Sequence, residues 1–575
     1  MGLESAQRGC GDRSDPKRRR RSKFGDLLHL RGRRNGKWAD KKVGPPIASQ
    51  PKYACTSLCL GGPTQSRQLS SKPVSPSVGN TCFARQRFRR VSRGCRPGGR
   101  FPDGLWRGEE HSCWHRHFCG QRRYRWVNPG VDQKPRTGYI GMILNRRDML
   151  LGTMASVLVP RPAVSKTSGI TLRPAPMSVQ WPGRTGALAG FLGFNGSLPG
   201  PEIRVKQGDR LRVRLENGLD DGALVHWHGI RVPNRMDGVS ILTQEVVPPG
   251  EAFDYEFSPP DAGTYWYHSH YLSYEQVGRG LFGPLIVEEK NPPEVDHDIT
   301  AILADFRMTP AGEFDTDFGV MEDFARWGRL GIALRVFLSQ SSVRLGDRVR
   351  LRLINAAIDR VFPLDLNGIN GSVVALDGMP LAQPTALEPM TIAPGQRVDI
   401  IGTVISDVSI STSDGDSLRQ IGRISMKGTN PTPGSELIQP LPAHGLPTPI
   451  RPGQSLKLVM RGGEGDPDHG GFGTWSFNGV SGLPMEPLGQ FRWGDTAEIT
   501  LSNPTAFDHG IHLHGHHFRE VLGSGPFGPW RDTLLVKAGE DRKIACVFDN
   551  PGRWLLHCHM LSHSADGMAT WVEVT

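Results

Sequence analysis

The sequence predicts an all-β protein of three consecutive Greek-key β-sandwich domains, and three observations support that prediction. The composition, with 71 glycines and 46 prolines in 575 residues, favours many turns and short strands over long helices. Residues 142–575 are too many for one ordinary hydrophobic core, which suggests two or three domains. A strand-forming segment also occurs three times within them.

Each copy of this repeat begins with Gly-Asp and reaches an asparagine nine positions after the glycine. The copies are residues 208–217, 346–355 and 494–503, and apolar and polar residues alternate inside each of them. A period of two predicts a half-buried strand. About 40 residues later each copy has a second shared turn that leads into another strand. These turns are residues 249–251, 394–396 and 538–540.

The strand segment and the second shared turn occur three times with nearly the same spacing between them. This repetition indicates three homologous domains. We place their boundaries in the proline-rich stretches at residues 291–293 and 440–442. In chain order, we predict a basic extension at 1–141, a signal peptide at 142–170, and domains at 171–292, 293–440 and 441–575.

The basic extension accounts for the positive net charge of the whole chain. It holds 31 lysines and arginines against 9 aspartates and glutamates, whereas the rest of the chain is acidic. We therefore expect no nucleic-acid binding by the body of the protein. A basic tail for nucleic acid and a metal site near Cys113 and Cys119 are alternatives, but no zinc-finger spacing supports them. An incorrectly assigned translation start explains more features of residues 1–141 than either alternative does.

A possible leader begins at Met142. Arg146 and Arg147 precede an apolar run over residues 149–159, which has the length of a signal h-region and is too short to span a membrane. The pattern resembles a bacterial twin-arginine signal. We expect translation from Met142, recognition by the twin-arginine export machinery, cleavage after about Ala163, a periplasmic location and no stable membrane span.

Four His-x-His pairs in the body carry the argument, where chance would give about half of one pair. Positions i and i+2 of a strand point to the same face, so each pair offers two imidazoles to one location. The first and third domains hold two pairs each and the second holds none. We expect eight imidazoles to meet between the first and third domains, with the second as a spacer. The pairs are His226 and His228, His268 and His270, His512 and His514, and His557 and His559.

A second constellation lies in the third domain. His509, Cys558, His563 and Met568 remain once the pairs are assigned, and the last two follow Cys558 by five and ten residues. A thiolate, two imidazoles and a distant thioether are the ligands of a blue-copper centre. Strand alternation sends Cys558 to the opposite face from its two histidine neighbours, which gives a covalent path between the two centres.

The motifs HWHG, HSH, HGIHLHGH and HCHMLSHSADGM resemble those of a multicopper oxidase of the laccase type, over roughly residues 190–575. The resemblance implies three cupredoxin-like domains, the second without copper, and four copper ions. It assigns His226 and His512 to the type 2 copper, and His509, Cys558 and His563 with axial Met568 to the type 1 copper. The type 3 pair would be held by His228, His268, His270, His514, His557 and His559.

Several further residues carry expectations from this resemblance. Asp237 matches an aspartate that helps to deliver protons near the three-copper cluster; the alternative is an ordinary turn residue before Gly238. Serines flank His563 where many bacterial members have acidic residues, so the role of those carboxylates is in doubt here. His516 and His517 fit no ligand position, and we expect them behind the ligands or at the surface. Cys546 is expected to be a buried strand residue without a disulfide.

The expected function is a copper-dependent oxidase that couples one-electron oxidation of a small substrate to reduction of O2 to water. Phenols, aromatic amines, Cu(I) and Mn(II) stay open as substrates, although the body has no Met-rich insertion typical of a dedicated Cu(I) oxidase. The alternative is a non-catalytic exported protein of the cell-division type, which has lost its copper ligands. We expect a monomer whose catalytic residues are Cys558, His557, His559 and Asp237.

Overall fold

The computed structural model describes residues 168–575 apart from 416, 434–436, 451–452, 467–471 and 524–526. The basic extension and the predicted leader up to residue 167 lie outside the described residues. The last three residues of the predicted leader, 168–170, belong to the first strand. Among the described helices, none has the length and apolar character needed to cross a membrane.

The first domain contains nine strands in three sheets, ordered β1-β5-β7, β2-β3 and β4-β9-β8-β6. Its elements are β1 (Ser168–Leu172), β2 (Pro174–Gln180), β3 (Ala187–Phe194), β4 (Ile203–Lys206), β5 (Leu211–Glu216), β6 (Val225–His228), the 3-10 helix η1 (Asn234–Met236), β7 (Ala252–Phe257), β8 (Gly263–Ser269), α1 (Ser273–Gly278) and β9 (Phe282–Glu288).

The second domain is one nine-stranded sheet, in which β11-β10-β13-β17-β14-β15 form the main path. Three of its strands are longer than the short ones that the composition predicts: β14 has 15 residues, β17 has 18 and β18 has 13. The elements are β10 (His297–Phe306), α2 (Met321–Ala325), β11 (Ala333–Leu338), β12 (Ser342–Leu345), β13 (Arg348–Asn355), β14 (Phe362–Leu376), β15 (Met379–Ala386), β16 (Met390–Ile392), β17 (Arg397–Asp414) and β18 (Ser417–Thr429).

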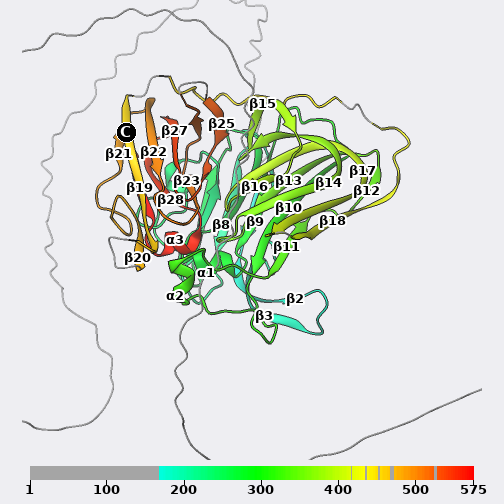
Figure 1. The fold of residues 1–575 in the computed structure, drawn as a ribbon, viewed down its shortest axis with the longest axis horizontal. Helices are drawn as coiled ribbons and strands as arrows, with labels where there is room; N and C mark the ends of the chain where they lie inside the picture. Colours follow the sequence, from blue (N-terminus) through cyan, green and yellow to red (C-terminus); the bar gives the residue numbers. More distant parts are fainter. Residues whose placement is uncertain (1–167, 416, 434–436, 451–452, 467–471, 524–526) are drawn as a thin grey trace, which may run out of the picture. The chain divides into compact units, whose positions relative to one another are not determined.

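The third domain has two sheets, ordered β20-β19-β22-β27-β24-β25 and β21-β29-β28-β23-β26. Its elements are β19 (Gln454–Glu464), β20 (Phe472–Phe477), β21 (Gly489–Phe491), β22 (Asp495–Ser502), β23 (His509–Leu513), β24 (Phe518–Val521), β25 (Phe527–Arg531), β26 (Thr533–Val536), β27 (Asp541–Phe548), β28 (Gly552–Cys558), α3 (Leu561–Ala565) and β29 (Ala569–Val574). The three short α-helices lie beside one another where the domains meet (Figure 1).

The sequence repeat corresponds to a shared three-stranded unit. The repeat strands β5, β13 and β22 each pair in parallel with the first strand of their sheet. Each also pairs antiparallel with the strand after the second shared turn, namely β7, β17 or β27. The expected all-β architecture is therefore confirmed, and the sequence repeat corresponds to the same arrangement of strands in each domain.

The repeated asparagines explain why the two sequence elements recur together. Asn217, Asn355 and Asn503 are buried, and their backbone amides donate to the carbonyls of Glu251, Gln396 and Glu540 in the second shared turn. Their side chains donate to backbone carbonyls of the loop after the strand and accept an amide two residues ahead. A buried amide side chain that satisfies loop backbone in this way fixes the strand-to-turn geometry in every domain.

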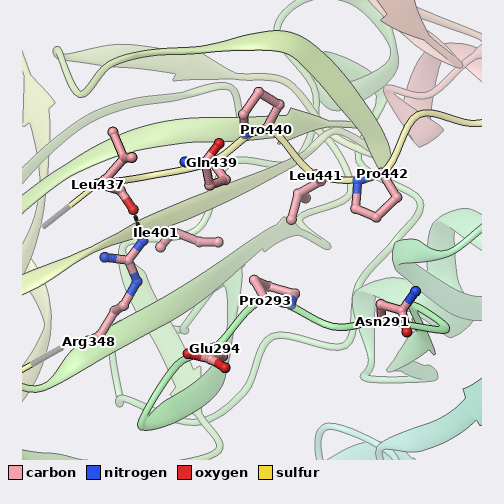
Figure 2. A pocket seen from close by; sticks show the side chains of 10 residues that line it. All are labelled: Asn291, Pro293, Glu294, Arg348, Ile401, Leu437, Gln439, Pro440, Leu441 and Pro442. Atoms are coloured by element: carbon pink, nitrogen blue, oxygen red, sulfur yellow. Dashed lines mark hydrogen bonds between the residues drawn. The ribbon is translucent and has the colours of Figure 1, made fainter. Parts of the chain in front are cut away.

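The linker between the second and third domains packs back onto the second domain. Leu441 is buried against Val374, Ala375 and Ile401. Beside it lies a cavity of about 440 Å³, in which the Arg348 guanidinium donates a 2.9 Å hydrogen bond to the Leu437 carbonyl (Figure 2). This linker therefore follows the domain surface along its described part.

Candidate metal centres

Two pairs of strands gather the eight paired histidines. In the first domain β6 and β8 place His226 directly opposite His268. In the third domain β23 and β28 place His512 directly opposite His557. Because side chains alternate along each strand, all four pairs turn toward the boundary between the two domains, where imidazoles from both come within ligand distance. The sets with ligand atoms within 4.8 Å of one another include His226, His228 and His268; His226, His512 and His514; and His270, His514 and His557.

Most of these imidazoles have one nitrogen held by the protein while the other faces the cluster. The Nδ1 atoms of His226, His268 and His512 lie 2.9–3.0 Å from backbone carbonyls, and their Nε2 atoms are buried without a hydrogen-bond partner. His228 has the reverse arrangement, with Nε2 next to Asp532 and Nδ1 unpartnered. Both nitrogens of His559 lack a partner. Buried polar atoms are rarely left unpaired, so this geometry fits metal ligation.

Burial favours the neutral form of His228, His270, His514 and His557. Desolvation lowers the pKa of His270 to about 3, and it lowers that of His228, His514 and His557 well below the ordinary value. Neighbouring imidazoles lower the pKa values further, because two positive rings would repel each other. A neutral imidazole is the form that binds a metal ion. The residues present therefore fit the copper cluster that the motifs imply.

Asp237 links the two halves of the cluster. It is fully buried after η1, and its carboxylate lies 2.9 Å from His514 Nδ1 and 3.2 Å from His226 Nδ1. Gly238 follows with a φ of +81°, and a side chain there would collide with the Val225 carbonyl. The tight turn therefore serves to present the carboxylate, and Asp237 contacts histidines of both domains.

The second centre lies on the other face of β28. Cys558 Sγ is 3.7 Å from His509 Nδ1 and 3.9 Å from His563 Nδ1, and the two nitrogens are 3.1 Å apart. Met568 is fully buried in the same hydrophobic cluster as Cys558, and the Cys558 amide donates to its carbonyl. Burial raises the pKa of the Cys558 thiol far above its ordinary value, so binding of a cation there must displace a proton. Burial lowers the pKa of His563 to about 4.

The Nε2 atoms of both imidazoles in this centre have hydrogen-bond partners in the protein. His509 Nε2 lies 3.0 Å from the Thr505 hydroxyl, and His563 Nε2 donates a 2.8 Å hydrogen bond to the Arg326 carbonyl of the second domain. The Trp475 ring packs against both imidazoles. Beyond Arg326 lies a cavity of about 400 Å³, formed by α2 and the third domain. Its lining is Met321, Glu322, Phe324, Ala325, Arg326, Gly473, Thr474 and Asp566.

Of the two alternatives expected for His516 and His517, the structure favours the position behind the paired histidines, since these residues are 2% and 4% exposed. One other expectation needs correction. The second domain is more than a spacer, since its turn at Gly395 packs against His228 and His559 and its Arg326 carbonyl holds His563. Cys546 is a buried residue of β27 without a disulfide, as expected.

Several contacts around the proposed ligands could not be inferred from the sequence. Asp532 is fully buried beside His228 and His512, and the Ser564 hydroxyl lies 3.2 Å from His557 Nδ1. Asp359, of the second domain, accepts hydrogen bonds from both the amide and the hydroxyl of Ser562. Asp532 directly precedes Thr533, a polar residue at the start of the mostly buried strand β26. This position is the one local feature of the sequence that could have identified Asp532.

Comparison with known proteins agrees with this geometry. Family models described as multicopper oxidase match residues 178–292, 334–409 and 457–575. The chain is 30% identical over 474 residues to multicopper oxidase MmcO of Mycobacterium tuberculosis, covering 72% of this chain and 88% of that protein. It is 28% identical to Laccase-1 of Botryotinia fuckeliana, covering 66% of this chain and 77% of that protein. The crystal structure of Lac15 from a marine microbial metagenome superposes with a TM-score of 0.62 and 45% identity, covering 70% of this chain and all of that one.

Proposed function

The chain belongs to the multicopper oxidase family, and on that basis we propose that it oxidises a small reducing substrate one electron at a time and reduces O2 to water at the histidine cluster. The observation that carries the proposal is the convergence of eight imidazoles, seven of them buried and that of His270 partly buried, directly behind a buried Cys-His-His set. The alternative of a non-catalytic protein of the cell-division type has no support. Such a protein has lost its copper ligands, whereas this chain keeps the expected set.

The bound copper supplies one-electron redox chemistry at the Cys558 centre and multi-electron reduction of O2 at the cluster. We assign four ions. His509, Cys558, His563 and Met568 would hold the type 1 ion. His226 and His512 would hold the type 2 ion. The type 3 pair would be held by His228, His268, His270, His514, His557 and His559.

The protein connects and serves these centres with its own groups. The peptide units of residues 557–559 join Cys558 to both neighbouring cluster histidines through covalent bonds. Asp237, which contacts two cluster histidines, is placed to hold and pass the protons that O2 reduction consumes. Burial around both sites excludes bulk water, which strengthens these polar interactions.

We place the reducing substrate in the cavity beside Arg326. Its carbonyl accepts the His563 hydrogen bond, so a molecule in this cavity would be separated from His563 by one backbone group. Phe324 and Met321 offer an apolar surface for a phenol or aromatic amine. The Glu322 and Asp566 carboxylates make a hard metal ion such as Mn(II) a second candidate, whereas Met321 is the one thioether that the described lining offers to Cu(I).

We further propose that the protein acts as a monomer in the periplasm after twin-arginine export. The twin-arginine-like leader at 142–170 supports export. Intact-mass analysis of the protein from its native host checks this: the expected mature chain begins after about Ala163, and a mature chain that contains residues 1–141 would contradict it.

Steady-state O2 consumption by one copper-loaded preparation with a phenol, Cu(I) and Mn(II) tests the proposed function. A phenol oxidase should keep its phenol activity in Glu322→Gln, whereas a metal oxidase should lose metal-ion turnover because one carboxylate is gone. Failure of the wild-type protein to consume O2 with any of the three would contradict the proposed function.

A further inference from the structure

The second shared turn of the repeat has a different environment in the second domain. Pro249–Glu251 of the first domain is exposed, and Ala538–Glu540 of the third is mostly so. The corresponding turn of the second domain, Pro394–Gln396, is buried. A Cβ added at Gly395 would lie 2.9 Å from His228 Cε1 and 3.1 Å from His559. The domain without His-x-His pairs therefore presents this turn directly to the cluster.

Arg397, the next residue, contacts all three domains with a fully buried guanidinium. Its Nε donates to the Thr264 carbonyl of β8, and its Nη1 donates to the Gly395 carbonyl, both at 3.0 Å. Its two Nη atoms donate to the two carboxylate oxygens of Asp532 at 2.9 and 2.7 Å. This bidentate pair fixes both the position and the plane of the carboxylate. Arg397 thus ties strand β8, which carries His268, to the third domain.

Asp532, which Arg397 fixes in place, contacts two cluster histidines, His228 and His512. Its Oδ1 lies 3.3 Å from His228 Nε2, and its backbone carbonyl accepts from His512 Nδ1 at 2.9 Å. The Thr533 hydroxyl donates to Asp532 Oδ1 at 2.8 Å and lies 3.1 Å from His512 Nδ1. Since both carboxylate oxygens already bind Arg397, Asp532 is placed to orient the histidines rather than to act as a ligand. Gln396 adds a 2.9 Å hydrogen bond from its side chain to the Thr533 carbonyl.

We propose that Arg397 of the second domain is a positioning residue for the copper cluster, acting through Asp532 on His228 and His512. The inference rests on the proposed copper cluster. Without the guanidinium, Asp532 would be a buried, uncompensated carboxylate and would leave its place. The imidazoles would then lose the group that fixes their orientation, which typically weakens metal binding. The Cys558 centre makes no contact with Arg397 in the described residues and should be unaffected.

Copper titration of the full-length protein, with copper content, blue absorption and the EPR signal of the type 2 copper measured together, tests the proposal. Arg397→Met and Asp532→Asn should keep the blue absorption and bind the type 2 copper about 10- to 100-fold more weakly. Arg397→Lys should give an intermediate loss, because it keeps the charge without the planar fork. These readouts are taken per blue, folded molecule and do not require turnover.

Arg350→Met is the matched control. Arg350 is 1% exposed, lies in the same domain, and pairs with Asp399 and Glu289, which make no hydrogen bond to a cluster histidine among the described residues. It should lower the unfolding temperature but keep the type 2 signal.

Equal type 2 copper affinities in Arg397→Met and Arg350→Met would overturn the proposal. If Arg397→Met does not fold, Arg397→Lys and Asp532→Asn decide by the same comparison with Arg350→Met. A wild-type protein without any type 2 signal would instead contradict the proposed function.

Discussion

The two candidate copper centres are assembled in different ways. The Cys558 centre takes its proposed ligands from residues 509–568 of one domain, and two of them lie within ten residues of Cys558. The eight-histidine cluster draws two strands from each of two domains, and the second domain adds Gly395 and Arg397 around it. The proposed ligands of the first centre therefore come from one domain, whereas those of the second come together only when domains dock.

The largest expected effect is the loss of the Cys558 centre while the histidine cluster keeps its copper. Cys558→Ser should abolish the blue absorption and all substrate oxidation, because a serine hydroxyl is a poor copper ligand and only the thiolate gives the intense band. The cluster histidines project from the other face of the strands, so about three coppers should stay bound. Copper analysis and EPR check this. Cys546→Ser, at the other buried cysteine, is the control and should stay blue. Unchanged phenol oxidation by Cys558→Ser would disprove the assignment.

Asp237→Asn should change the histidine cluster and leave the Cys558 centre intact. The amide keeps the shape but cannot accept and pass a proton, so turnover should fall by about 10²- to 10⁴-fold while the blue absorption stays. The backbone carbonyl of Asp237 still accepts from His226, which should preserve copper binding. Stopped-flow or steady-state O2 consumption over acid and neutral pH measures the loss. Asp305→Asn, at a buried carboxylate paired with Arg360, should affect stability and leave turnover unchanged. Wild-type turnover in Asp237→Asn would show that Asp237 is only a turn residue.

The smallest predicted effect is a pH-dependent difference between the copper-free and copper-loaded proteins. Folding lowers the pKa of His270 to about 3 and that of His563 to about 4, chiefly through burial. Between these values and about 6.5 the unfolded chain binds more protons, so the copper-free protein loses stability as the pH falls. At pH 5 each such histidine should cost about 2 kcal/mol.

Bound copper should remove most of this slope, because a metal-bound imidazole nitrogen cannot take a proton. His516 and His517, whose pKa values burial also lowers, are not proposed ligands and should leave a residual slope in both forms. Chemical denaturation of both forms at about pH 7 and about pH 5 measures the difference. Equal slopes would indicate that copper does not bind these imidazoles.

The same contrast explains what the sequence could predict. Strand alternation predicts that each His-x-His pair turns to one face, and the structure adds that His226 lies opposite His268 and His512 opposite His557. The Asn-containing repeat likewise predicted the shared strand unit, because both depend on residues close in the chain. Contacts such as Arg397 with Asp532 or His563 with Arg326 join residues more than 130 positions apart. They depend on domain docking, for which hydrophobic periodicity carries no signal.

Long strands in the second domain were missed for a related reason. Its composition is rich in turn residues, yet β14 and β17 each pass continuously along a large sheet. Glycines inside them, such as Gly368 at a φ of +91°, mark bends within a strand rather than its end. A glycine alone does not distinguish these two cases in a sequence.

The central claim is that one chain holds two separate copper centres with different ligand chemistry. The most direct measurement is EPR together with copper quantitation on a single wild-type preparation. We expect about four coppers per chain: about one with the signal of a blue thiolate site, about one with an ordinary type 2 signal, and about two silent because they form a coupled pair. Copper that is entirely EPR-visible, or a total of only one or two ions per folded chain, would contradict the account.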